Sequence, residues 1–160
     1  MTEDLDTGRY VAVLRRLYGI VVAWEELVAR VAPDWLEEIR IPRRRQEMLR
    51  DDLAYFDIEA SHSEIPALPP IRSFSELLGA MYVMEGSTLG GQLIARHVER
   101  VLCLEPGVGN AYFRSHGERT GTMWKEFCEV LRNRIPDAEA NDAVLSAKAM
   151  FRAFGDWMRG

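Results

Sequence analysis

The spacing of apolar residues predicts helices along nearly the whole chain. Between Arg9 and Val31 they recur three or four residues apart, which is the spacing of one face of an α-helix. They are Tyr10, Val13, Leu14, Leu17, Val21, Trp24, Val28 and Val31. Pro33 ends this helix, because proline removes a hydrogen-bond donor and clashes with the preceding turn. A second helix is predicted after Pro42, through the stretch RRRQEMLRDDLAYF.

The second half of the chain continues the pattern. A loop, DIEASHSEIPALPPIR, contains prolines that exclude a helix interior. Ser73 followed by Glu76 forms a capping box, which predicts one helix from Ser73 to about Leu102. A short segment at 110–115 leads into a helix over TGTMWKEFCEVLRNRI. Pro136 precedes a last helix whose apolar face contains Val144, Ala147, Phe151, Phe154 and Met158.

No segment shows sustained period-two alternation, and there is no internal repeat. The predicted fold class is therefore all-α, in a single helical domain spanning residues 1–160. The net charge of −5 and the lack of a basic stripe argue against nucleic acid as a partner. The short basic cluster Arg43 to Arg45 is interpreted as a solvated helix end.

A cytoplasmic location is expected, because the polar, acidic start is not a secretion signal and no apolar run is long enough to span a membrane. Cys103 and Cys128 cannot form a disulfide framework and are interpreted as packing residues.

The predicted helix over 73–102 carries an unusual number of glycines. Each interior glycine costs about 1 kcal/mol of helix stability relative to alanine. Gly79, Gly86, Gly90 and His97 fall within about 40° of one another around the helix axis. Such a surface lets something flat or bulky lie against the backbone, and the neighbouring Ser87 and Thr88 carry hydroxyls able to hold water. The alternative is that another helix crosses closely at these positions.

The segment LLGAMYVMEGSTLGGQLIARHV resembles the distal helix of heme oxygenases, most closely the bacterial kind associated with bacteriophytochromes. YVAVLRRLYGIVVAWEEL is similar to the second helix of that family and IPRRRQEMLRDDLAYF to the third. GNAYFRSHGERTGTMWKEF and AKAMFRAFGDWM resemble the later helices. The resemblance implies a heme oxygenase-like bundle without its first helix. It also implies oxidative opening of heme to biliverdin, iron and carbon monoxide, with O2 and a separate reductase, and a phytochrome system as an expected client.

The resemblance also implies a set of site residues. Gly86 and Gly90 would contact the porphyrin, with Thr88 beside them. Ser87 stands where several relatives carry an acid that orders water over bound O2. The family meets the heme propionates with basic residues on the helix that here contains Met123 and Glu129, so Arg119, Lys125 and Arg15 are the nearby candidates.

The family's iron ligand is a histidine on the first helix, and no histidine of this chain aligns with it. His62 is interpreted as solvent-exposed, His97 as making a structural hydrogen bond, and His116 as a cap or surface group. The metal ligand is therefore unknown. Either the coding start lies upstream, another group ligates the iron, or the activity is lost.

Two alternatives to the enzyme remain open: a non-catalytic protein that binds heme or a bilin, and a structural helical dimerisation module. Without the first helix, the helix over 9–31 and the last helix would expose apolar faces. We therefore expect a second copy to cover them in a homodimer.

Overall fold

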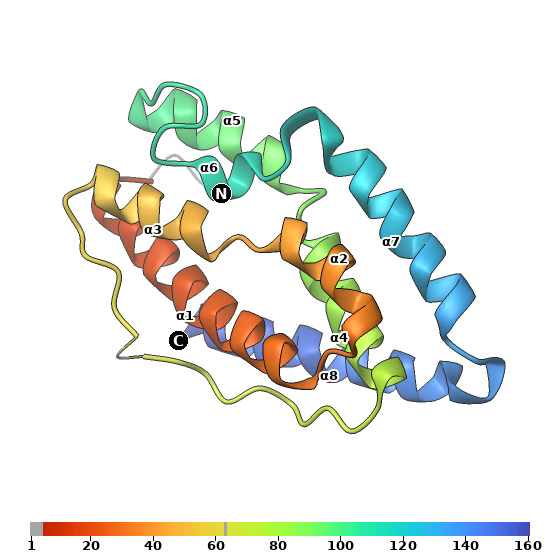
Figure 1. The fold of residues 1–160 in the computed structure, drawn as a ribbon. Coiled ribbons are helices and arrows are strands. Elements are labelled where there is room, and N and C mark those ends of the chain that lie inside the picture. The colour runs from red at the N-terminus through yellow and green to blue at the C-terminus, as the bar shows by residue number, and fades with distance from the viewer. Residues whose placement is uncertain (1–4, 63) are drawn as a thin grey trace.

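The computed structural model describes residues 5–62 and 64–160, which form helices joined by loops, with no strand (Figure 1). The predicted all-α class is confirmed. The helices are α1 Thr7–Val31, α2 Glu37–Arg40, α3 Gln46–Tyr55, α4 Phe74–Gly86, α5 Gly91–Leu102, α6 Ala111–Arg114, α7 Thr120–Arg134 and α8 Ala140–Arg159. Single 3-10 turns η1 Asp34–Leu36, η2 Ile41–Arg43, η3 Gly117–Arg119 and η4 Asp137–Glu139 connect some of them. No helix of the described residues is long and apolar enough to cross a membrane.

Helix α1 forms the centre of the core. Its N-terminus is capped by Asp6, whose side chain accepts a hydrogen bond from the backbone N–H of Arg9, and its last turn ends just before Pro33. Its buried residues extend over more than one face, from Tyr10 to Val28. A helix buried so widely must be covered by several others. Figure 1 shows α3 beside α1 and α8 passing behind it.

The predicted helix after Pro42 begins later than its sequence suggests. Ile41–Arg43 form the turn η2, and α3 starts only at Gln46. Arg43 and Arg45, interpreted above as part of a solvated helix end, are 9% and 4% exposed. That interpretation is wrong, because both guanidinium groups find carbonyl partners inside the fold; only Arg44 of the cluster is exposed.

The capping box at the start of α4 is confirmed. The side chain of Ser73 accepts a hydrogen bond from the N–H of Glu76, and the Glu76 carboxylate accepts one from the N–H of Arg72. However, the prediction of one helix from Ser73 to Leu102 is wrong. Residues 87–90 interrupt it as a series of tight turns, so that α4 ends at Gly86 and α5 begins at Gly91.

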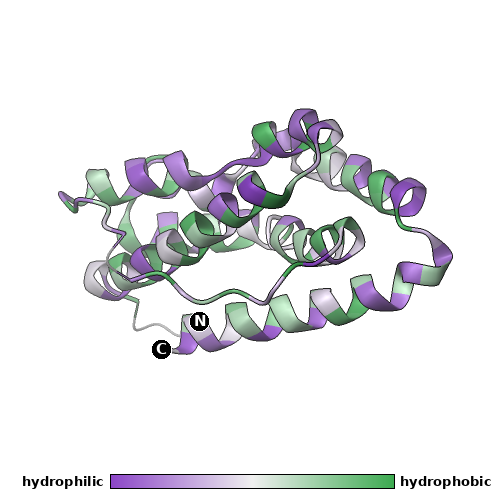
Figure 2. Cartoon of the chain, turned by 60° about the horizontal axis from the view of Figure 1, so that its bottom comes forward, coloured by the Kyte–Doolittle hydropathy of each residue, from purple (hydrophilic) through white to green (hydrophobic). Residues whose placement is uncertain are grey.

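Helix α8 lies against α4 at a close approach. A Cβ atom on Gly79 would lie 2.1 Å from the carbonyl oxygen of Ala143, so only glycine fits there. Gly79 therefore serves helix packing, the alternative considered for the glycine surface. In Figure 2, α8 runs along the lower edge to the C-terminus and carries hydrophobic residues along its length. Three of them, Val144, Leu145 and Phe151, are exposed, as expected for the last helix.

On α1, the large apolar side chains that are exposed are Val13 and Val31. The packing role expected of the cysteines is wrong for Cys103. That residue is exposed and ends α5 in a left-handed conformation with a φ of 55°. Cys128 is partly buried on α7.

A buried carboxylate anchors the segment that carries α6. Asp52 is 1% exposed, and its two oxygens accept hydrogen bonds from the N–H groups of Ala111 and Tyr112, at 2.7 and 2.9 Å. These are N–H groups at a helix start, which have no partner inside the helix. Burial raises the pKa of Asp52 to about 6, against the two backbone hydrogen bonds, which lower it. Asp52 thereby connects α3 to α6.

We expect Asp52→Ala to lower the free energy of unfolding by about 2–4 kcal/mol, because each buried N–H left unpaired costs about 1–3 kcal/mol. The folded-state pKa of about 6 lies above the ordinary value of 3.8. The stabilising contribution of Asp52 therefore decreases as the pH rises through that interval, and the deficit of the variant should be larger near pH 4 than near pH 7. Urea denaturation at both pH values measures this. Asp51→Ala, at the exposed neighbouring position, is the control, and an equal effect of the two substitutions would contradict the assignment.

Candidate functional site at the junction of α4 and α5

The break between α4 and α5 arises from the side chains of the sequence GSTLGG. Ser87 and Thr88 donate their hydroxyl hydrogens back to the carbonyl oxygens of Met84 and Glu85, at 2.6 and 2.7 Å. Hydroxyls that bond to the preceding turn compete with helical hydrogen bonding and bend helices. The backbone of this segment forms hydrogen bonds between residues three apart, for example from the N–H of Leu89 to the carbonyl oxygen of Gly86 at 3.2 Å. The junction is therefore a bend with its own internal hydrogen bonds.

Arg45 holds this bend from the side of α3. Its Nη2 atom donates to the carbonyl oxygen of Met84 at 2.9 Å and to Oγ of Ser87 at 3.3 Å. Its guanidinium also lies over the ring of Tyr112, 4.7 Å from the centroid. A positive charge is favourable at the C-terminal end of a helix, where unpaired carbonyl groups gather. Arg45 is thus fixed by contacts to both α4 and α6.

A buried ion pair lies one turn away. Nε of Arg43 is 3.2 Å from Oε2 of Glu85, and both side chains are less than a tenth exposed. Arg43 also donates to the carbonyl oxygens of Ile39 and Met123, at 2.7 and 2.9 Å. Burial raises the pKa of Glu85, and the charges of Arg45 and Arg43 oppose that rise. The pair connects α4 to the start of α7.

An apolar cavity of about 270 Å³ opens beside the bend. It lies between α1, the α4–α5 junction, α5, α6 and α8, and its lining is mostly apolar apart from the Arg45 guanidinium and the hydroxyl-bearing Ser87 and Thr88. The lining residues are Val13, Leu17, Arg45, Ser87, Thr88, Gly91, Ile94, Tyr112, Phe113, Phe154 and Met158. A mostly apolar pocket with a few convergent polar groups is the usual form of a small-molecule site.

The glycines at the bend have different surroundings. A Cβ on Gly91 would lie 2.4 Å from the carbonyl oxygen of Phe113, so this glycine allows α6 to approach. A Cβ on Gly86 would meet the indole of Trp124 at 3.5 Å, an ordinary contact. A Cβ on Gly90 would meet nothing within 4 Å. Of the two glycines expected to contact a macrocycle, Gly90 has an open side and Gly86 is covered by an indole.

Comparison with known proteins identifies the family. The model for heme oxygenase matches residues 1–160. A heme oxygenase from Xanthomonas campestris pv. campestris (strain 8004) is 34% identical over 157 residues, which cover 94% of this chain and 88% of that protein. The chain belongs to the heme oxygenase family. No solved structure matches it. The resemblance stated above is confirmed for the family, and the heme-degrading function is supported over the alternatives.

The three histidines lie away from the cavity of this heme oxygenase family member. His62 is exposed, as predicted, and its Nε2 lies 3.0 Å from the hydroxyl oxygen of Tyr18. His97 shares a hydrogen bond with Arg100 through Nδ1, at 3.3 Å, which agrees with a structural role. His116 precedes η3 without capping it through its side chain, and burial together with the charges of Arg45, Arg43 and Arg119 lowers its pKa.

The basic residues expected to meet propionates do not line the cavity. Arg119 is exposed and lines a different cavity of about 380 Å³, together with Arg43, His116 and Glu126. Lys125 is exposed on α7 and lines neither cavity. Both assignments therefore stay predictions.

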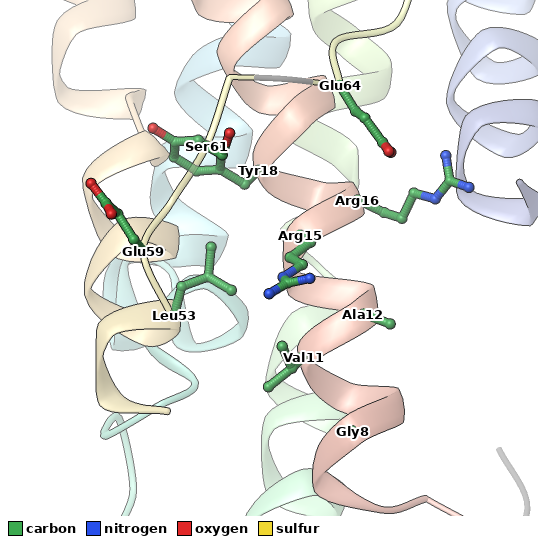
Figure 3. Close-up of a pocket in the computed structure, with 10 residues that line it drawn as sticks. All are labelled: Gly8, Val11, Ala12, Arg15, Arg16, Tyr18, Leu53, Glu59, Ser61 and Glu64. Atoms are coloured by element: carbon green, nitrogen blue, oxygen red, sulfur yellow. The ribbon is translucent and has the colours of Figure 1, made fainter. Parts of the chain in front are cut away.

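Arg15 lines a third cavity, of about 500 Å³, between α1 and the loop over 57–72 (Figure 3). Val11 and Tyr18 line it from the same face of α1, whereas Val13 and Leu17 face the apolar cavity. Because its lining includes both basic and acidic side chains, this larger space lacks the apolar character that a flat macrocycle needs.

The sequence predicted the hydroxyl groups of the site but missed Arg45 and Tyr112. The only signal for Arg45 was its place in a basic cluster, and such clusters are usually solvated. Its burial follows from the position of α3 against the α4–α5 bend, which local spacing does not encode. A signal was available for Phe154 and Met158, which share the predicted apolar face of the last helix and line the cavity.

We expect Arg43→Ala to destabilise the fold by about 3–5 kcal/mol, because it leaves the Glu85 carboxylate buried without its ion-pair partner. Arg44→Ala is the matched control, because the Arg44 side chain is half-exposed and pairs with Glu25 at 3.4 Å. Its effect should stay below about 1 kcal/mol, as for other exposed ion pairs. Thermal and urea denaturation measure the stability of both variants. If Arg43→Ala lowers the free energy of unfolding no more than Arg44→Ala does, the Arg43–Glu85 pair does not stabilise the fold as expected.

Proposed function

We propose that this chain binds heme against Gly90 and takes part in its oxidative cleavage to biliverdin, iron and carbon monoxide. The observation that carries the proposal is the apolar cavity at the α4–α5 junction, to which Arg45 and Ser87 contribute polar groups, together with the exposed Gly90, which precedes the lining residue Gly91 and has an open side. Membership of the heme oxygenase family supports the same conclusion. O2 and electrons from a separate reductase belong to the proposal, as does a link to a bacteriophytochrome system, which rests on the resemblance of the glycine segment.

Large apolar side chains near Gly90 in the sequence and on α8 are exposed. Leu89 and Leu93, on either side of it in the sequence, are 48% and 74% exposed, and Phe151 on α8 is 71% exposed. Phe151 shares a helix face with Phe154 and Met158, which line the cavity. Leu93 lines a separate cavity of about 460 Å³ on α5, and neither Leu89 nor Phe151 is among the residues that line the apolar cavity. Heme, when bound, supplies the iron that activates O2 and the ring that is opened.

Ser87 is restricted in how it can act. Its hydrogen is donated to the carbonyl oxygen of Met84, and its oxygen accepts from Arg45. What remains on the hydroxyl is acceptor capacity. A water held by Ser87 would therefore donate one hydrogen to it and keep the other for the ligand. Ser87 and Thr88 would then contribute an ordered water and no charge, while Arg45 supplies a fixed positive charge nearby.

No histidine of the described residues lines the cavity, so the proposal leaves the iron ligand unassigned. Titration with hemin, followed by ascorbate under air, tests the function. We expect a saturable Soret band and then the absorption of verdoheme or biliverdin. Saturable binding without turnover would favour the non-catalytic heme or bilin-binding alternative. Absence of any Soret shift would refute heme binding and leave the structural module.

Gly90→Leu is expected to weaken hemin binding by at least about tenfold, because overpacking a close contact costs about 1–3 kcal/mol. Gly121→Leu is the matched control, since a Cβ there also meets nothing within 4 Å and Gly121 lies on α7, away from the cavity. Both variants should keep the wild-type melting temperature within a few degrees. Soret titration measures the affinity, and equal affinities for the two variants would contradict heme contact at Gly90.

We further propose that a second copy covers the exposed residues Val144 and Leu145 of α8 in a homodimer. The support is the exposure of large apolar side chains on one helix. Sedimentation equilibrium at micromolar concentration should give twice the chain mass of 18.3 kDa. A monomer at that concentration would contradict the dimer.

A further inference from the structure

Arg45 is the only charged residue among the described residues that line the apolar cavity. Its side chain is buried, with 4% of its surface exposed. Nη2 donates hydrogen bonds to the carbonyl oxygen of Met84 and to Oγ of Ser87. Nε and Nη1 have no hydrogen-bond partner in the part of the chain that the structure describes. The guanidinium therefore has N–H donors to spare beside an apolar space.

The ring of Tyr112 holds the guanidinium of Arg45 without using these donors. The guanidinium carbon lies 4.7 Å from the ring centroid, so the ring covers one face of the planar group. The N–H bonds of a guanidinium lie in its plane, and stacking on an aromatic face leaves them free. Arg45 is thus fixed in position while it keeps unused donors.

The positive charge of Arg45 also lacks a carboxylate of its own. None of the ion pairs among the described residues includes Arg45. Arg43 pairs with Glu85, and Arg44 pairs with Glu25. The charge of Arg45 does act on Glu85, but that single carboxylate is shared with Arg43. Because a buried charge without a partner is costly, the cavity favours a ligand that carries a negative charge.

The surroundings of His116 support this account of the charges. Burial lowers the pKa of His116, and the positive charges of Arg45, Arg43 and Arg119 lower it further. The positive charge near Arg45 therefore acts beyond its own side chain.

The size and lining of the cavity restrict what the anion can be. The volume is about 270 Å³ and the lining is otherwise mostly apolar, which suits an apolar body that carries one anionic group. A porphyrin is larger than this space, so only one edge of it can enter. An edge with methyl or vinyl groups would exclude water from the guanidinium and offer it no acceptor. An edge with a propionate would supply both the acceptor and the negative charge.

We propose that Arg45 binds the carboxylate of an apolar ligand in this cavity, and that in heme this carboxylate is a propionate. The identification with heme rests on the proposed function. The contact fixes the orientation of the macrocycle relative to Ser87, which lines the same cavity. Biliverdin retains both propionates, so the same contact holds the product after the ring is opened.

Soret titrations with hemin and with hemin dimethyl ester, in which both propionates are neutral, test the proposal. We expect the wild type to bind the ester at least about tenfold more weakly, because a hydrogen-bonded charge pair is lost. In Arg45→Gln the two ligands should bind with affinities within about twofold of each other. The comparison is a double-mutant cycle, so differences between the ligands that do not involve Arg45 cancel.

Arg44→Gln is the matched control, because Arg44 is the exposed member of the same basic cluster and does not line the cavity. It should keep the wild-type preference for hemin over the ester. Far-ultraviolet circular dichroism checks that each variant is folded. If Arg45→Gln does not fold, Arg45→Lys decides, because the ammonium lacks the in-plane donors of the guanidinium. Its preference for hemin should be at least about threefold smaller than that of the wild type.

A second ligand pair tests the carboxylate contact without heme. Isothermal titration calorimetry of the wild type with 2-naphthoate and with the neutral 2-naphthamide compares an apolar ring system with and without the negative charge. We expect the carboxylate to bind at least about tenfold more tightly than the amide, and Arg45→Gln or Arg45→Lys to reduce that preference.

The outcomes distinguish this inference from the proposed function. Hemin and its ester binding equally to the wild type would overturn the role of Arg45 and leave heme binding intact. A preference for hemin that persists unchanged in the folded Arg45 variants would also overturn it, because the propionate would then be bound elsewhere. If the wild type does not bind hemin, the proposed function is refuted and the naphthalene pair decides. Equal binding of that pair, or no binding of either, would then overturn the carboxylate site as well.

Discussion

The site depends on the buried side chains of Arg43 and Arg45, which contact the C-terminal end of α4 from the segment before α3. Arg45 donates to the carbonyl oxygen of Met84 and to Ser87, and Arg43 pairs with Glu85 and donates to the carbonyl oxygen of Met123. A charge buried without a partner is very costly, so these contacts have to form together with the fold. They connect α3, α4 and α7 at one point. The bend at 87–90 is therefore held from outside as well as by its own hydroxyl groups.

The four glycines of this region show how one residue type serves separate purposes. Gly79 and Gly91 admit backbone carbonyl groups of α8 and α6 at distances that no side chain allows. Gly86 admits the edge of an indole, and Gly90 leaves its side open. Gly79 and Gly91 are required for packing, and they let α8 and α6 come close enough to contribute residues to the lining of the cavity. Gly90 alone of the four has no atom within 4 Å of a Cβ position.

The chemistry of the junction is consistent with the family to which the chain belongs. An apolar cavity lined by Ser87 and Thr88, whose hydroxyl hydrogens are already donated to carbonyl oxygens, and by one fixed positive charge offers little to donate protons strongly. Ser87 has its own hydrogen committed to a carbonyl, so it differs from an acid at the same place both in charge and in what it can give. Any ordering of water near a bound ligand would come from geometry, through groups that the bend and Arg45 hold in place.

Local patterns in the sequence determined the helical class, the cap at Ser73 and the end of α1 before Pro33. These features depend on neighbours within a few residues, which is the range over which spacing and capping act. The resemblance of the glycine segment to the heme oxygenase family could also be seen in the sequence, because its residues are contiguous.

Tertiary structure alone decided the burial of Arg43 and Arg45 and which glycine stays open. Each of these depends on a partner far away in the sequence: Met123 for Arg43, Met84 for Arg45 and Trp124 for Gly86. A basic cluster has the same local pattern whether it faces water or the carbonyl groups of a distant helix. Only the packing of α3 and α7 against the bend distinguishes the two, because it brings those partners within reach.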